Sequence, residues 1–338
     1  MKEGSTAPWP AGAWRKDLAD AVTDIEELLR LLGLDDGPQA EIPSALRGFP
    51  LRVPRAFIER MRPGDLDDPL LRQVLPLVQE DETTPGFKAD PVGELDAPPV
   101  HSVLHKYQSR ALVMMTGACA VHCRYCFRRH FPYSDHIAVG GEADAAIDRI
   151  AADPEITEVI LSGGDPLSMA DGSLEVFARK LTAVPSVRRL RIHTRLPIVL
   201  PKRVDGGLCS WLGSLGLAVV VVVHANHANE IDISVRRALA ALERTGATLL
   251  NQSVLLAGVN DSVDAQANLS EALFDAGVLP YYLHLLDRVE GAAHFEVPEE
   301  EAKRLHAELA ARLPGYLVPK LVREVPGAPA KIGVDLWR

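Results

Sequence analysis

The sequence predicts an α/β protein: a partial barrel of six β/α units preceded by an N-terminal helical region. From about residue 105 onward, short runs rich in Val, Ile and Leu alternate with amphipathic stretches, which is typical of a parallel sheet with helices between its strands. The run LAVVVVV at residues 217–223 is apolar on both faces. A strand with this pattern is expected to be covered by helices on each side.

The N-terminal region is expected over residues 1–105. Residues 15–34 carry Leu, Val and Ile at three- and four-residue intervals, which predicts an amphipathic helix. Shorter helical pieces are expected at residues 54–61 and 68–78. Residues 81–100 are dense in Pro and Gly and predict a winding connector.

The barrel is expected over residues 106–314, and a C-terminal segment over 315–338. The predicted strands cover residues 111–115, 158–161, 188–193, 217–224, 247–255 and 279–286. The predicted helices lie near residues 142–152, 173–183, 203–214, 234–245, 263–276 and 298–312. Six units are too few to close an eight-stranded barrel, although GYLVPKLVREV at residues 315–325 is a candidate for one more strand.

Polar clusters lie in, end or follow five of the predicted strands. They are SGGDP (162–166), HTR (193–195), HANHANE (224–230), NQS (251–253) and HLLD (284–287). Barrel enzymes build their sites at the rim where strands end. Contact of strand ends with solvent would explain one or two such clusters but explains five poorly, so we expect the active site at this rim.

Composition excludes several kinds of partner. The 36 basic and 46 acidic residues give a net charge of −10, which argues against a broad nucleic-acid-binding surface. The start of the chain has no signal-peptide pattern, and the longest apolar run, at residues 215–223, is too short to span a bilayer. We therefore expect a cytoplasmic protein that binds neither nucleic acid nor membrane. In a reducing compartment, clustered cysteines more often bind metal or do redox chemistry than form disulfides.

Three cysteines in a C-x3-C-x2-C pattern follow the first predicted strand: Cys119, Cys123 and Cys126. Iron–sulfur cubanes ordinarily take four thiolates, so three would leave one iron open to a ligand. A structural zinc ion normally takes four protein ligands, and it would have to recruit His122, His130 or Cys209. That alternative stays open, although Cys209, in GGLCSWLG, is expected to be a small core residue.

The cysteine pattern after the first strand of a partial barrel resembles that of radical SAM enzymes. This resemblance implies a [4Fe-4S] cluster whose open iron binds S-adenosylmethionine. The stretches HKYQSRALVMMTGACAVHCRYCFRRHFP, SGGDPL, RIHTRLPIVLP, HANHANEID, NQSVLLAGVND and PYYLHLLDRVEGAAHF resemble, in order and spacing, the lysine 2,3-aminomutase family over residues 100–335. The N-terminal region is most similar to the branch that makes (R)-β-lysine for elongation factor P.

The resemblance implies an isomerase that converts L-α-lysine into (R)-β-lysine with pyridoxal 5′-phosphate as a further cofactor. It implies that Lys331 forms a reversible imine with pyridoxal phosphate. The residues that match family positions around that cofactor are Lys106, Arg110 and Gln252. The residues placed near S-adenosylmethionine are Gly163, Gly164 and Asp165, and the further rim candidates are His193, Arg195, His224 and Asn226.

For the substrate, the resemblance places the carboxylate of lysine on Arg128, whose planar guanidinium can hold it bidentately. It places the far ammonium on Asp287 and Glu324, which would favour a cationic side chain. The competing interpretation of Arg128, Arg129 and His130 is a solvated basic loop, which is credible for Arg129.

The sequence departs from the free-lysine enzymes near its end. PGAPAK replaces their glycine-rich run, and seven residues follow Lys331, without a zinc-binding extension. We therefore expect no zinc and a functional link to elongation factor P and its ligase, with flavodoxin or ferredoxin as electron donor. The alternatives are a mutase for lysine catabolism or for another amino acid such as glutamate, and a non-enzymatic metal-binding protein that docks on elongation factor P.

Overall fold

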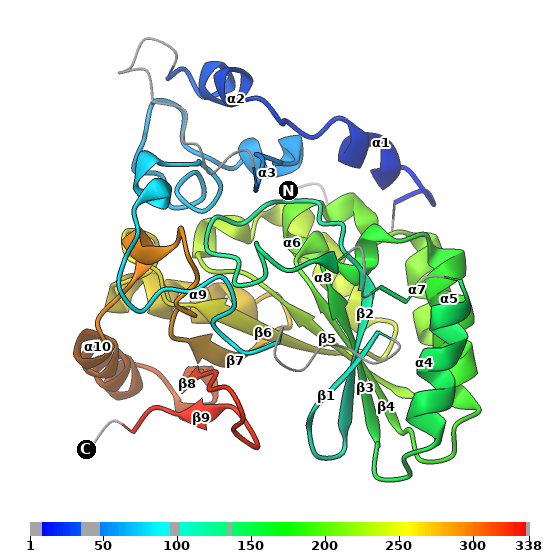
Figure 1. The fold of residues 1–338 in the computed structure, drawn as a ribbon. Coiled ribbons are helices and arrows are strands. Elements are labelled where there is room, and N and C mark those ends of the chain that lie inside the picture. The colour runs from blue at the N-terminus through cyan, green and yellow to red at the C-terminus, as the bar shows by residue number, and fades with distance from the viewer. Residues whose placement is uncertain (1–8, 35–47, 95–101, 134–136, 139, 336–338) are drawn as a thin grey trace.

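The computed structural model describes residues 9–34, 48–94, 102–133, 137–138 and 140–335, apart from the side chain of Lys106. In this part of the chain, nine strands form one sheet whose spatial order follows the chain (Figure 1). The strands are β1 (Val103–Tyr107), β2 (Arg110–Thr116), β3 (Glu158–Gly163), β4 (Arg189–Thr194), β5 (Ala218–Val223), β6 (Thr248–Val254), β7 (Leu279–His284), β8 (Lys320–Arg323) and β9 (Ile332–Gly333). β2 to β8 are parallel, and β1 and β9 pair antiparallel at the two edges. The sheet is an open barrel, as predicted.

The six predicted strands and the additional strand at 315–325 are confirmed. β5 is the valine run, and its inward and outward side chains are mostly buried, since the helices cover the outer face of the sheet. The sequence did not predict β1, which joins β2 through the two-residue turn at Gln108 and Ser109, nor the two-residue β9.

Six helices follow the parallel strands, at the positions that the sequence predicts. They are α4 (Gly141–Ala151), α5 (Asp171–Thr182), α7 (Gly206–Gly213), α8 (Ile233–Glu243), α9 (Val263–Phe274) and α10 (Glu299–Arg312), with the short α6 (Leu196–Val199) between β4 and α7. Side chains cap several of them: Asp205, Asp232 and Ser262 each accept a hydrogen bond from a backbone N–H of the first turn. α4, α5 and α7 lie side by side on one flank of the sheet (Figure 1).

The predicted long helix of the N-terminal region, over residues 15–34, is wrong. Residues 15–34 do not form a single helix but α1 (Trp14–Ala19) and α2 (Ile25–Leu31). Between them Val22 exchanges two backbone hydrogen bonds with Val53, at 2.8 and 2.9 Å, and Asp24 caps α2 by accepting from the N–H of Glu27. The chain pairing and the cap both require non-helical backbone, and they override the apolar periodicity.

The two shorter helical predictions fare differently. Residues 54–61 contain the one-turn helix α3 (Arg55–Ile58), whereas residues 68–78 form turns instead of the predicted helix. The carboxylate of Asp68 accepts from the N–H groups of Leu70 and Leu71, which favours a local turn over a continuous helix. The 3-10 turns are η2 (Val78–Asp81), η4 (Pro166–Ser168), η5 (Pro201–Arg203), η6 (Ala228–Glu230), η7 (Ala293–Phe295) and η8 (Gly315–Leu317).

The N-terminal region shares its hydrophobic core with the barrel. Trp14, Leu28 and Phe57 belong to the same buried cluster as the strand residues Leu161 and Val221. α1 contacts η5, α3 contacts α6 and η2 contacts η7, so the region covers part of the rim where the strands end (Figure 1). The expected boundary after residue 105 falls inside β1, and the division of the chain into segments stays a prediction.

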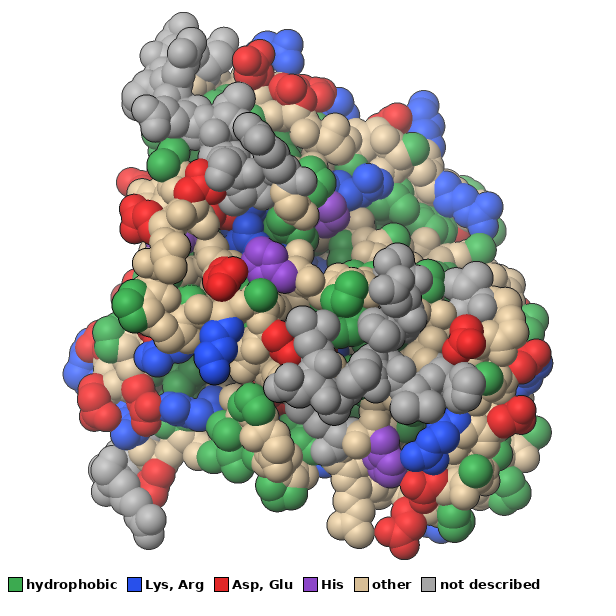
Figure 2. All heavy atoms as spheres, viewed as in Figure 1, with side chains coloured by type: hydrophobic (Ala, Val, Ile, Leu, Met, Phe, Trp, Pro, Cys, Tyr) green, Lys and Arg blue, Asp and Glu red, His purple; other side chains and the backbone are tan. Residues whose placement is uncertain are grey.

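The distribution of charged side chains on the surface agrees with the expectation that the protein has no broad basic patch. Basic and acidic side chains are interspersed over the face seen in Figure 2, without a continuous basic patch among the residues coloured there. Among the described helices, none has the length and apolarity needed to cross a membrane.

Candidate active site

A cavity of about 270 Å³ opens at the ends of the parallel strands, inside the barrel. Nearly all of the site residues expected from the sequence line it. They are Arg110, Cys119, Cys123, Cys126, Arg128, Gly163, Gly164, Asp165, His193, Arg195, His224, Asn226, Gln252, Asp287, Glu324 and Lys331. The exception is Lys106, whose backbone lies in β1 and whose side chain is outside the described part of the structure.

The three cysteines of the C-x3-C-x2-C pattern lie in the loop after β2, partly exposed to this cavity and free of disulfides. Burial raises the pKa of the Cys119 thiol well above its usual range and that of Cys126 to about 11. Neutral thiols are poor ligands, so a bound cation has to displace the proton from Cys119 and Cys126. In the described residues, no three His, Cys, Asp or Glu side chains converge as ligands of a single ion do. An iron–sulfur cubane does not need its ligands on a single ion, because each thiolate binds a different iron. Three cysteines spaced along one loop fit this requirement.

The candidates for a fourth zinc ligand have other contacts. The Nδ1 of His122 lies 2.8 Å from the carbonyl oxygen of Pro50, and its ring stacks on Phe49. His130 is exposed, with its Nε2 3.4 Å from the carbonyl oxygen of Glu290. Cys209 is half-buried on α7 against the main core, as expected.

Arg195, which follows β4, contacts the cysteine loop directly. Its Nη1 donates to the sulfur of Cys123 at 2.6 Å, and its Nη2 donates to the side chains of Gln73 at 2.6 Å and Glu230 at 3.2 Å. The Nδ2 of Asn226 also donates to Gln73, at 3.0 Å. Gln73 belongs to the N-terminal region and is fully buried, so that region helps to hold the guanidinium against Cys123.

The Gly-Gly-Asp turn after β3 packs tightly against the same loop. Gly163 has φ +113°, and a Cβ at Gly163 or Gly164 would lie within 2.5 Å of a carbonyl oxygen of residues 116–118. Only glycine fits this approach. The carboxylate of Asp165 is buried and accepts from the hydroxyl of Thr194 and from the backbone N–H of Arg195. The N–H groups of Gly164 and Asp165 donate to the carbonyl oxygens of Thr116 and Ala118, at 2.6 and 2.8 Å, so the turn ties β3, β4 and the cysteine loop together.

Lys331 lines the same cavity from the segment between β8 and β9. Its Nζ donates to Glu324 at 2.9 Å and lies over the ring of Tyr282, 5.9 Å from the centroid. The hydroxyl of Tyr107 donates to the other oxygen of Glu324 at 2.5 Å, and the guanidinium of Arg110 stacks on the ring of Tyr107. A reactive amine, a cation and an aromatic ring stand together here, which are groups suited to an anionic aldehyde cofactor.

Three histidines line the cavity at the ends of β4, β5 and β7: His284 is buried, and His193 and His224 are half-buried with their Nε2 atoms out of contact with solvent. The Nε2 atoms of His193, His224 and His284 have no hydrogen-bond partner among the described residues. Burial lowers the pKa of His193 well below its usual range and those of His224 and His284 to about 3, and the nearby Lys331 adds to each shift. The rings are neutral at pH 7, and their unpaired nitrogens mark places where a polar ligand would bond.

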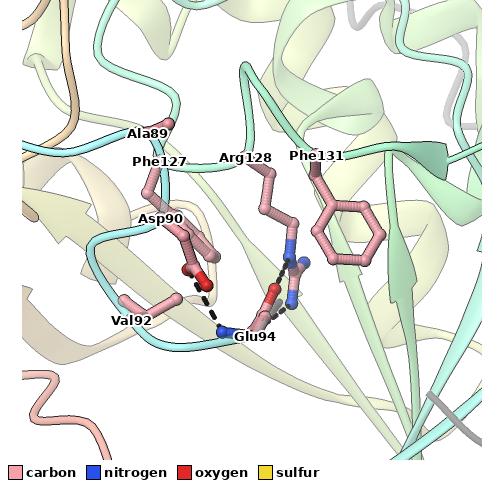
Figure 3. A pocket seen from close by; sticks show the side chains of 7 residues that line it. All are labelled: Ala89, Asp90, Val92, Glu94, Phe127, Arg128 and Phe131. Atoms are coloured by element: carbon pink, nitrogen blue, oxygen red, sulfur yellow. Dashed lines mark hydrogen bonds and ion pairs between the residues drawn. The ribbon is translucent and has the colours of Figure 1, made fainter. Parts of the chain in front are cut away.

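The loop after the last cysteine carries Arg128 and Arg129, which have different partners. Arg128 holds Glu94 through Nε at 2.7 Å and Nη2 at 2.8 Å (Figure 3). The interpretation of Arg129 as a solvated residue is wrong, because its side chain is 2% exposed and donates to the buried carboxylate of Glu80 at 2.6 Å. Arg124 binds the same carboxylate.

Several known proteins similar to this chain carry the same name. No protein-family model matches the chain. The L-lysine 2,3-aminomutase of Escherichia coli K12 is 52% identical over 324 residues, which cover 96% of this chain and 94% of that protein. That of Haemophilus influenzae is 46% identical over 94% of both chains, and that of Clostridium subterminale is 33% identical over 99% of this chain and 80% of its own length. This chain belongs to the L-lysine 2,3-aminomutase family.

Family membership confirms the resemblance stated from the six motifs, and it makes the chain an isomerase. It rules out the non-enzymatic docking protein as the main function. Among solved structures, a radical SAM methyltransferase from Sphaerobacter thermophilus has a TM-score of 0.44 and 18% identity over 65% of this chain and 68% of its own. A likeness this weak adds nothing to the assignment.

Sequence reasoning missed several residues of this aminomutase-family cavity. His284 had a sequence signal, because it begins the HLLD cluster at the end of a predicted strand, but the sequence analysis did not name it as a site residue. Glu230 also had one, since it ends the HANHANE cluster. Glu94 and Gln73 had none: both lie in the N-terminal region, and their partners Arg128 and Glu230 lie 34 and 157 residues away in the chain. Of these three, Glu94 lines the cavity, and Gln73 and Glu230 reach it through Arg195.

Proposed function

We propose that this protein converts L-α-lysine into (R)-β-lysine, using a [4Fe-4S] cluster, S-adenosylmethionine and pyridoxal phosphate held in one cavity. The observation that carries the proposal is the lining of that cavity, because one cavity is lined by the three cysteines, Lys331, Arg128 and Asp287. The names of the relatives supply the substrate.

Each group has a proposed holder. Cys119, Cys123 and Cys126 bind the cluster. The backbone of residues 163–165, together with Arg195, Asn226, His193 and His224, surrounds S-adenosylmethionine. Lys331 carries pyridoxal phosphate, with Lys106, Arg110 and Gln252 around it. When bound, these groups supply reversible removal of a hydrogen atom from carbon and a covalent carrier for the migrating amino group.

The protein's own residues position the substrate. Arg128 binds the α-carboxylate and Asp287 the far ammonium, with Glu324 as the second carboxylate. Glu324 pairs with the ammonium of Lys331 in this structure, which supports its suitability for a lysine-type cation. The N-terminal region covers the rim and keeps water from the reacting groups.

The test is anaerobic turnover. Protein reconstituted with iron and sulfide is incubated with L-lysine, S-adenosylmethionine, pyridoxal phosphate and dithionite, and the products are separated by chiral chromatography. We expect (R)-β-lysine from the native chain and none from Lys331→Ala, while Lys180→Ala, a surface variant on α5, retains activity. Conversion of other amino acids without conversion of lysine would refute the substrate.

The substrate charge can be tested separately. Asp287→Asn combined with Glu324→Gln removes both carboxylates proposed for the far ammonium, so lysine turnover should fall sharply. If lysine turnover survived both changes, a mutase for another amino acid such as glutamate would become the better candidate.

We further propose that the β-lysine serves modification of elongation factor P by its ligase, in the cytoplasm, with flavodoxin or ferredoxin as electron donor. The similarity of the N-terminal region to that branch supports this role. The test is the mass of elongation factor P from cells lacking this protein: the β-lysyl increment should disappear and return when β-lysine is fed. An unchanged mass would favour lysine catabolism.

A further inference from the structure

The guanidinium of Arg128 forms an ion pair with the carboxylate of Glu94. Glu94 takes the Nε and Nη2 edge of the guanidinium at 2.7 and 2.8 Å, and both side chains are less than a tenth exposed. Figure 3 shows the two side chains facing each other, with Phe127 and Phe131 beside them. The Arg128 guanidinium lies 4.7 Å from the centre of the Phe127 ring. This is a built, desolvated pair and not a surface contact.

The segment that carries Glu94 is anchored to the barrel. Lys88 forms a two-hydrogen-bond bridge with residues 288–290, directly after Asp287: its N–H donates to the carbonyl oxygen of Arg288, and its own carbonyl accepts from Glu290. The carboxylate of Asp90 then accepts from the N–H of Glu94 at 3.1 Å (Figure 3). The position of Glu94 is therefore fixed relative to the proposed site for the far ammonium.

The pairing leaves one edge of the guanidinium available. A guanidinium has five N–H donors in a rigid plane, and Glu94 accepts hydrogen bonds only along the edge formed by Nε and Nη2. The Nη1 atom points to the end of β3, where its contacts with the hydroxyl of Ser162 and the carbonyl oxygen of Gly163 are long, at 3.2 and 3.4 Å. Ser162, Gly163 and Arg128 line the main cavity. A ligand carboxylate that replaced these long contacts would gain two short charge-assisted hydrogen bonds.

We propose that Glu94 is a positioning residue for the substrate: it holds one edge of Arg128 so that the Nη1–Nη2 edge presents a fixed fork to the α-carboxylate. It also neutralises the buried guanidinium while the site is empty, when an unpaired charge would be costly. This inference rests on the proposed binding of the lysine carboxylate by Arg128. The opposite possibility is that Glu94 competes with the substrate for the same guanidinium.

The two possibilities predict kinetic changes of opposite sign in the reconstituted holoenzyme. If Glu94 positions Arg128, Glu94→Ala raises KM for lysine by roughly tenfold or more, the effect of losing a charge-assisted hydrogen-bonded pair. Glu94→Gln gives a smaller rise, because the amide oxygen still accepts one hydrogen bond. If Glu94 competes, both variants lower KM, and that result would overturn the proposal.

Two comparisons keep the result interpretable. Inhibition by L-lysinamide, which lacks the carboxylate, should be the same in Glu94→Ala and in the native enzyme, whereas general damage to the cavity would weaken it too. Iron content and melting temperature confirm folding, and Glu175→Gln on the exposed face of α5 serves as the matched surface control. If Arg128→Lys leaves KM unchanged, the carboxylate site itself is wrong. If Arg128→Lys raises KM and Glu94→Ala does not, only the role of Glu94 fails.

Discussion

Glu80 joins the N-terminal region to the cysteine loop, and its replacement measures what that contact contributes. Its side chain is completely buried and accepts from Arg124 through Nε at 2.8 Å and Nη2 at 2.5 Å, and from Arg129 through Nη2 at 2.6 Å. Phe49 lies 5.0 and 5.1 Å from the two guanidinium carbons. Glu80→Ala leaves two buried cations without their shared anion, and breaking a buried pair costs about 3–5 kcal/mol.

The loss is measurable by differential scanning calorimetry under anaerobic conditions. Unfolding entropy of about 2.1 cal/mol/K per residue gives roughly 0.7 kcal/mol/K for this chain, so Tm should fall by about 4–7 °C. Glu175→Ala, which breaks an exposed pair with Arg179 on α5, should cost at most about 1 kcal/mol and lower Tm by about 1 °C. Equal shifts in the two variants would show that the buried pair contributes no more than a surface one. Because Arg124 lies between Cys123 and Cys126, two of the proposed cluster ligands, we also expect Glu80→Ala to retain less iron.

Three further results are expected. Cys119→Ala, Cys123→Ala and Cys126→Ala should each abolish cluster binding, measured as iron per chain and by Mössbauer spectroscopy, whereas Cys209→Ala should keep its iron; iron loss from Cys209→Ala would contradict the assignment. Gln73→Ala should release Arg195 from Cys123 and so remove a hydrogen bond to sulfur worth about 1 kcal/mol. For a one-electron couple this loss lowers the midpoint potential of the cluster by roughly 40 mV. An unchanged potential in an EPR-monitored titration would mean that Gln73 does not hold Arg195 on Cys123. Burial lowers the pKa of His284 to about 3, so between about pH 6.5 and 3 the imidazole is protonated in the unfolded chain but stays neutral in the folded one, and the free energy of unfolding falls as the pH falls. In denaturant unfolding of the apo protein, His284→Asn should therefore show a shallower dependence of this free energy on pH over that range. An identical pH dependence in the two proteins would refute a neutral buried ring.

Local sequence patterns predicted the barrel because they are set by local chemistry. The valine run needs cover on both faces wherever it lies, and polar clusters at five strand ends had to meet at one rim once the strands were parallel. The break between α1 and α2 had a local signal in the N-cap Asp24, but it also depends on Val22 pairing with Val53, 31 residues later, which no local pattern indicates. Arg129 was misjudged for the same reason: nothing near it in the chain indicates Glu80, which lies 49 residues earlier.

The open barrel gives the two terminal regions separate tasks at one cavity. The N-terminal region binds the cysteine loop through Glu80 and Gln73, and its backbone accepts from the loop itself, since the N–H of Arg124 donates to the carbonyl oxygen of Gln73 at 2.9 Å. The C-terminal segment contributes Lys331 and Glu324 from the hairpin of β8 and β9. Damage to the first should therefore lower cluster occupancy while Lys331 still reacts with pyridoxal phosphate, and damage to the second should do the reverse. The separation has a limit, because the hydroxyl of Tyr107 in β1 donates to Glu324 after β8, so one hydrogen bond joins the two edges of the sheet.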